Sequence, residues 1–119
     1  MKENIILTKT YDFAVKIVLL SQEIRNEKRE FSIADQILRS GTSIGANMEE
    51  AMGGQSAKDF FAKLTISYKE ARETKYWLRL LKDTNIITLE RQKTLYNDIE
   101  EILRIIGSIQ KTHRQNNPN

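Results

Sequence analysis

The chain contains no cysteine, and this absence excludes a disulfide framework, thiolate metal ligands and a cysteine nucleophile. Its one proline is Pro118, so no proline interrupts a helix within residues 1–117. The longest apolar run, Ile17 to Leu20, is far shorter than the roughly 20 residues that cross a membrane. The first residues lack the apolar core and small-residue cleavage site of a secretory signal, so we expect a cytoplasmic protein.

Patterns typical of catalytic sites and cofactor sites are also missing. His113 is the single histidine, and its place in a basic tail favours a surface residue over a catalytic base, which requires a fixed partner. No Glu-x-x-His pair of the di-iron bundles occurs. The glycines follow no strand and precede no Gly-Lys-Ser/Thr, which excludes a phosphate loop. We therefore expect a protein that is not an enzyme and that has no cofactor.

Acidic residues leave one alternative open. Glu70 and Glu73 share a helix face, and Glu49 or Glu50 lies on the preceding helix, so these carboxylates can hold a hard cation or form structural ion pairs. Arg72 and Lys75, which lie near them, favour structural ion pairing, and we predict no metal site.

What the chain does contain is helical periodicity. Hydrophobic residues make up 39% of the 119 residues, as in a globular protein, and strand signals are nearly absent. Apolar residues recur at helical spacing in four segments, about 5–27, 32–52, 57–83 and 89–112. Short turns between helices predict an all-α, antiparallel up-down-up-down four-helix bundle. We place one domain at residues 1–114 and a disordered tail at 115–119.

The seams of these helices predict the core. In the third helix, large residues lie at both ends of the seam and small residues lie in its middle. The predicted core residues are Ile6, Phe13, Ile17, Leu20 and Ile24; Ile33, Ile37, Ile44, Met48 and Ala51; Phe60, Leu64, Ser67, Ala71, Thr74, Leu78 and Leu81; and Leu95, Ile99, Ile102, Ile106 and Ile109.

Helix boundaries follow from capping residues. Ser32, Ser56 and Thr88 are the predicted N-caps, with Asp35 and Asp59 at the reciprocal positions of the first two. Gly53-Gly54 ends the second helix. Gly41 and Gly45 lie inside that helix and indicate either a break or a continuous helix on which a neighbour packs closely. Apolar spacing survives on both sides, which favours a continuous helix, straight or kinked.

Positive charge is concentrated in the third helix, since residues 56–85 hold seven Lys or Arg against four Asp or Glu. Six of these cations and two tyrosines fall within an arc of roughly 140° at 100° per residue. This basic stripe consists of Lys58, Lys69, Arg72, Lys75, Arg79, Lys82, Tyr68 and Tyr76. It is either a solvated outer face or a surface for the phosphates and stacked bases of a nucleic acid.

The first helix is apolar around more than half its circumference, because nearly consecutive apolar residues run from Phe13 to Leu20. A single bundle buries one stripe of each helix. The surplus indicates either a broad intramolecular core or contact between copies, and we favour self-association.

A longer pattern resembles a known family. It comprises the run from Arg39 to Asn47, Glu50-Ala51, Lys58-Asp-Phe60, Lys63-Leu64, the run from Lys69 to Thr74, and Trp77-Leu78. This pattern resembles the four-helix-bundle proteins of the 23S rRNA intervening-sequence family, some of which are encoded inside insertions within bacterial 23S rRNA genes. The motif residues to which we assign a structural role are Arg39, Ser40, Gly41, Ser43, Gly45, Asn47, Glu50, Glu70, Glu73 and Trp77.

The resemblance implies a ring-shaped homopentamer of bundles. A similar bundle, the accessory variability protein of diversity-generating retroelements, is a basic pentamer that binds nucleic acid and a reverse transcriptase. The favoured hypothesis is therefore a non-catalytic homo-oligomer that binds RNA or DNA through the basic stripe. The alternative is a protein-interaction scaffold with no role in nucleic-acid binding.

Overall fold

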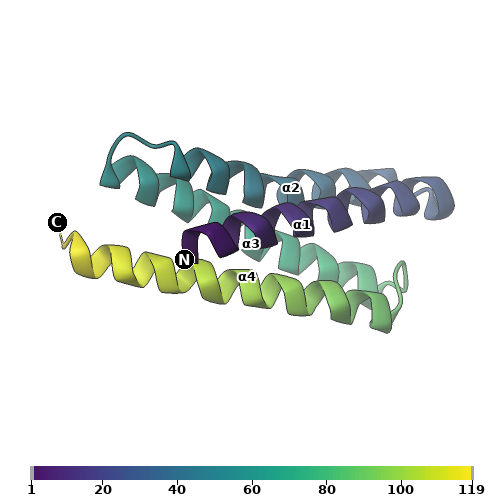
Figure 1. Ribbon diagram of the computed structural model, residues 1–119. Coiled ribbons are helices and arrows are strands. Elements are labelled where there is room, and N and C mark those ends of the chain that lie inside the picture. The colour runs from purple at the N-terminus through teal and green to yellow at the C-terminus, as the bar shows by residue number, and fades with distance from the viewer. Residues whose placement is uncertain (1, 119) are drawn as a thin grey trace.

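The computed structural model describes the backbone of residues 2–118 and the side chains of residues 5–118, and it consists of long helices packed side by side (Figure 1). The helices are α1 (Lys2–Glu23), α2 (Phe31–Met52), α3 (Ala57–Asp83) and α4 (Leu89–Asn116). A short π-helix, η1 (Ile24–Lys28), continues α1. The described residues include no strand, and the molecule measures 47 × 22 × 21 Å. The all-α prediction is confirmed.

The four helices form a closed antiparallel arrangement. Each helix packs against the next one in the chain, and α4 returns to pack against α1. The turn between α2 and α3 lies at one end of the molecule, and the other two turns lie at the opposite end (Figure 1). This is the up-down-up-down bundle that short connections predict.

The predicted seams form the core. On α1 and η1, on α3 and on α4, every predicted seam residue is buried, except that Phe60 is half-buried and packs against the core. On α2 the seam is buried from Ile37 to Ala51, while Ile33 is half-buried. Burial at helical spacing on all four inner faces is what holds the bundle together.

Two of the three predicted caps are confirmed. The hydroxyl of Ser56 accepts a hydrogen bond from the backbone N–H of Asp59, and that of Thr88 accepts one from Arg91. The prediction for Ser32 is wrong, because α2 begins at Phe31 with Glu30 as its N-cap and no side-chain cap. Arg29 takes a left-handed conformation (φ 57°) that ends η1. The next helix, α2, then begins one residue before its predicted start at residue 32.

The α2 helix is continuous through both of its inner glycines, as favoured from the sequence. A Cβ atom on Gly41 would lie 2.7 Å from Cγ2 of Ile17, and one on Gly45 would lie 3.3 Å from the carbonyl oxygen of Thr10. Both glycines therefore let α1 approach α2 closely. The loss of helix propensity at each, about 1 kcal/mol relative to alanine, is offset by this packing.

The α4 helix extends to Asn116, past its predicted end and into the predicted tail. His113 explains the extension, because its ring lies 5.2 Å from that of Phe61 and 5.3 Å from that of Phe60. The backbone and side-chain amides of Asn117 both donate to the carbonyl of His113. His113 is thus half-buried against α3 and is not the surface residue of a frayed tail. Met1 and Asn119, at the ends of the predicted domain and tail, lie outside the described residues.

Candidate nucleic-acid interface

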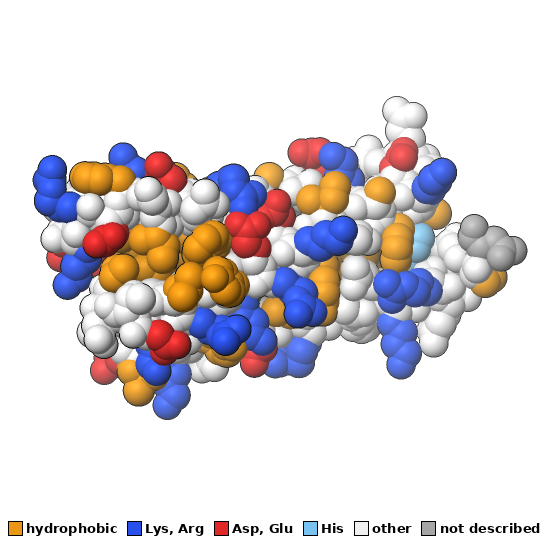
Figure 2. Space-filling view, turned by 180° about the vertical axis from the view of Figure 1, so that it is seen from behind, with side chains coloured by type: hydrophobic (Ala, Val, Ile, Leu, Met, Phe, Trp, Pro, Cys, Tyr) orange, Lys and Arg blue, Asp and Glu red, His pale blue; other side chains and the backbone are white. Residues whose placement is uncertain are grey.

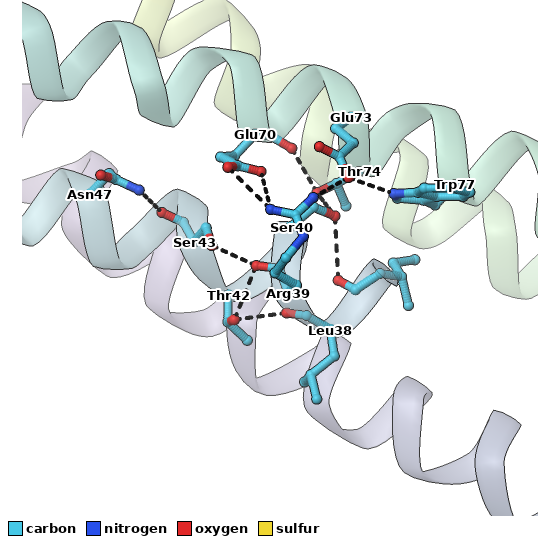
Figure 3. Close-up of polar contacts among 11 residues, drawn as sticks. Leu38, Arg39, Ser40, Thr42, Ser43, Asn47, Glu70, Glu73, Thr74 and Trp77 are labelled. Carbon is cyan, nitrogen blue, oxygen red and sulfur yellow. Dashed lines mark hydrogen bonds and ion pairs between the residues drawn. The ribbon is translucent and has the colours of Figure 1, made fainter. Parts of the chain in front are cut away.

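Most of the motif residues lie where α2 packs against α3 (Figure 3), whereas Gly41 and Gly45 face α1. The guanidinium of Arg39 donates to Glu70, with Nη1 3.2 Å from Oε1, and also to Glu73. Trp77 Nε1 donates to the same Glu73 carboxylate at 3.0 Å. The hydrogen bond from Arg39, and to a smaller extent the one from Trp77, holds the pKa of Glu73 below its ordinary value. These four residues form an ionic clasp between the two helices.

Buried hydroxyl groups lie directly beneath the clasp. Thr74 Oγ1 is 2.9 Å from Ser40 Oγ and 2.8 Å from the carbonyl oxygen of Glu70, and Ser67 Oγ donates to the carbonyl of Ile44 at 2.8 Å. Every buried polar side-chain atom among the described residues has a hydrogen-bond partner. Small residues therefore bring α2 and α3 close together, and their hydroxyl groups bond across the contact.

Two further motif residues, Ser43 and Asn47, bond within α2, and Glu50 pairs with α3. Ser43 Oγ donates to the carbonyl of Arg39 at 2.6 Å, and Asn47 Nδ2 donates to the carbonyl of Ser43 at 2.8 Å. Glu50 pairs with Lys63 on α3 at 2.7 Å. Of the carboxylates considered as cation ligands, Glu50, Glu70 and Glu73 are thus engaged by basic side chains, whereas Glu49 is exposed. In the described part of the chain, no group of three or more acidic or histidine side chains is placed to hold a metal ion.

The opposite edge of α3 borders an open groove, with a volume of about 560 Å³, between α3 and α4. Five of the eight stripe residues line it, together with three residues of α4. The lining residues are Tyr68, Arg72, Lys75, Tyr76 and Arg79 of α3, and Glu100, Leu103 and Arg104 of α4. Side chains from two helices thus form one concave, mainly basic surface, which we call the α3–α4 groove.

One cation of the groove is already paired. Lys75 Nζ lies 2.8 Å from Oε2 of Glu100 and 5.2 Å from the centre of the Tyr96 ring. The hydrogen bond between Lys75 and Glu100 raises the pKa of Lys75 and lowers that of Glu100. Arg72, Arg79 and Arg104 are exposed and have no ion pair within the described residues. Three guanidinium groups therefore remain available to an anionic ligand.

The other stripe residues lie outside the groove. Lys58 lines a separate depression with Phe61, His113 and Arg114 at the far end of α3. Lys82 pairs with Asp83 at 3.2 Å, and Lys69 is exposed on the outer surface of α3. On the face shown in Figure 2, several lysine and arginine side chains gather near the centre of the molecule, beside a hydrophobic patch, and others are spread over its ends and edges. The structure thus divides the predicted stripe into a groove and scattered surface cations.

Arg104 lines the groove but is not part of the predicted stripe. It follows Leu103, which lies beside the α4 seam, and it is one helical turn after Glu100. These signals place Arg104 at the border of the core but do not indicate which neighbouring helix it faces. That choice depends on the handedness of the bundle, which only the structure provides.

Known proteins resemble the chain over most of its length. Residues 2–108 match the model of the family described as 23S rRNA-intervening sequence protein. A crystal structure from Bacteroides thetaiotaomicron, of a protein of unknown function from the S23 ribosomal protein family, is 50% identical, with a TM-score of 0.92. The similarity covers 93% of this chain and 99% of that one. No curated protein matches significantly, and no helix in the described region is long and apolar enough to cross a membrane.

Proposed function

The chain belongs to the 23S rRNA-intervening sequence protein family, and from this premise we propose that it is a non-catalytic homo-oligomeric bundle that binds RNA or DNA along the α3–α4 groove. The observation that carries the proposal is the gathering of Arg72, Arg79 and Arg104 around two tyrosines, with no ion pair to any of the three arginines from the described residues. Neither the family description nor that of the similar structure names a reaction.

The groove suits a polyanion chemically. A guanidinium group forms two parallel hydrogen bonds with one phosphate, and arginine also stacks on flat rings. Tyrosine rings offer a surface on which bases of any sequence can stack. The single carboxylate of the groove, Glu100, is held by Lys75, so its charge is locally balanced. The net charge of the free groups in the groove is positive.

Titration of the protein with labelled rRNA fragments and with single-stranded DNA over a salt series tests the proposal. We expect binding at low salt that weakens as salt rises, because phosphate contacts release counterions. Replacing Arg72 and Arg79 with Glu should weaken binding and flatten the salt dependence. Lys93→Glu is the matched control, since Lys93 is an exposed residue of α4 outside the groove with no ion pair among the described residues.

Two results would contradict the proposal. One is the absence of binding at low salt, and the other is an affinity that the Arg72→Glu and Arg79→Glu replacements leave unchanged. Retention of a protein partner from nuclease-treated lysate, together with either result, would favour the scaffold alternative.

The exposed side of α1 supports self-association. Tyr11, Val15 and Leu19 follow one another at intervals of four residues, and Tyr11 and Leu19 are 66% and 57% exposed. A second copy packed on this row would remove apolar surface from water. Light scattering should give a multiple of the 13.9 kDa chain mass, and the pentamer implied by the resemblance would have a mass of about 70 kDa. A mass of 13.9 kDa would refute self-association.

A further inference from the structure

We propose that the α3–α4 groove selects single-stranded over double-stranded nucleic acid, with one base stacked on Tyr76 and the flanking phosphates held by Arg72, Arg79 and Arg104. This inference rests on the proposed nucleic-acid function. It adds the class of ligand and assigns the stacking role to a single residue.

Tyr76 is placed as a stacking platform. Its side chain is 50% exposed, and its ring meets the Trp77 ring nearly edge to face, with centroids 5.1 Å apart. Trp77 is itself held by the hydrogen bond to Glu73 within the ionic clasp (Figure 3). An aromatic ring restrained by a fixed neighbour loses little conformational freedom when a base stacks on it. The clasp between α2 and α3 therefore also supports the platform beside the groove.

The arginines lie at suitable intervals around the platform. Arg72 precedes Tyr76 by four residues and Arg79 follows it by three, so both are its neighbours on the helix surface. At 1.5 Å per residue, the rise between Arg72 and Arg79 is roughly 10 Å. Three stacked nucleotides span about the same length at roughly 3.4 Å each. Arg104 faces the same space from α4. A short single strand can thus place phosphates on both sides of a stacked base.

The shape and floor of the groove disfavour a duplex. Tyr68 and Leu103 line the groove and are half-buried, which provides an apolar surface for a base and none for a phosphate. In a duplex the base faces are stacked on each other and are not available to Tyr76. Neighbouring helix axes lie about 8–10 Å apart, so a duplex would touch only the rim of a groove between them. A single strand uses the floor, the platform and all three arginines.

Fluorescence anisotropy with an unstructured 12-nucleotide strand and its duplex, at one low salt concentration, tests the inference. We expect tighter binding of the single strand by the wild-type protein. Tyr76→Ala should weaken single-strand binding about 5- to 150-fold, the equivalent of the roughly 1–3 kcal/mol measured for one stacked base, and leave duplex binding nearly unchanged. Tyr76→Phe should retain the preference, because it keeps the ring. Phe31→Ala, which removes an exposed ring of α2 that does not line the groove, is the matched control.

The outcomes separate the two proposals. Equal affinity for strand and duplex, or a single-strand affinity that Tyr76→Ala leaves unchanged, would overturn the inference while the proposed function stands. Absence of binding to both probes would overturn the proposed function and the inference with it. Thermal melting of each variant shows whether it is folded, and Tyr76→Phe tests the platform with the smallest change to the fold.

Discussion

The two edges of α3 differ in what their polar side chains do. On the edge that faces α2, Arg39 is bonded to Glu70 and Glu73, and buried hydroxyl groups bond across the contact. On the edge that faces α4, Lys75 is paired with Glu100, but three arginines around the groove have no ion pair among the described residues. Charges that are paired stabilise the fold, whereas charges that are left unpaired are available to a ligand. One helix therefore holds the bundle together on one edge and presents the candidate binding surface on the other.

The largest expected effect on stability comes from placing a larger side chain at Ala71, on the buried seam of α3. Ala71 is fully buried where α3 packs in the core, so Ala71→Leu should overpack this contact and lower the free energy of unfolding by about 1–3 kcal/mol. Ala62→Leu makes the same change at an exposed position of α3 and should alter the free energy by less than about 0.5 kcal/mol. Thermal melts of both variants measure the difference. Equal midpoints would show that Ala71 is not closely packed.

A second test compares two glycines. Gly41→Ala places a Cβ within 2.7 Å of Ile17, a stiff and fully buried residue, so we expect a net destabilisation of about 1 kcal/mol despite the gain in helix propensity. Gly107→Ala on α4 meets nothing within 4 Å and should stabilise the protein by up to about 1 kcal/mol. Chemical denaturation would report the two opposite signs. Stabilisation by both replacements would mean that α1 does not press on Gly41.

A smaller, pH-dependent effect belongs to the ionic clasp. Because the folded state lowers the pKa of Glu73 below its ordinary value of 4.5, its contribution is present above about pH 4.5 and is lost as the pH falls through the folded pKa. Glu73→Gln should lower the free energy of unfolding by about 0.5–1 kcal/mol at pH 7, and this difference should vanish in acid. Glu49→Gln, at an exposed carboxylate with no ion pair among the described residues, should show no such dependence. The same difference at pH 3 and pH 7 would contradict an ionic role.

The bundle and the buried seam of α3 could be predicted from the sequence, because both depend on the spacing of residues along one helix. The seam through Ser67, Ala71 and Thr74 and the continuity of α2 past Gly41 both follow from helical periodicity. The groove could not be predicted in this way. It depends on how α4 is rotated against α3, so the stripe included Lys58 and Lys69, which lie outside the groove, and omitted Arg104.

The errors at helix ends have a similar cause. The start of α2 depends on the left-handed residue Arg29, and the end of α4 depends on the stacking of His113 against two phenylalanines of α3. At the start of α2, an unusual backbone angle overrides the local capping signal of Ser32. At the end of α4, contacts with a distant segment override the signal of the polar tail.

A single titration tests most directly whether the α3–α4 groove, as opposed to the whole basic stripe, is the binding surface. Arg104→Glu changes a groove residue that the stripe does not contain, and Lys69→Glu changes a stripe residue outside the groove. With one labelled single strand at low salt, we predict that Arg104→Glu weakens binding roughly five- to tenfold and that Lys69→Glu stays close to the wild-type affinity. Loss of binding in Lys69→Glu with wild-type affinity in Arg104→Glu would contradict the account.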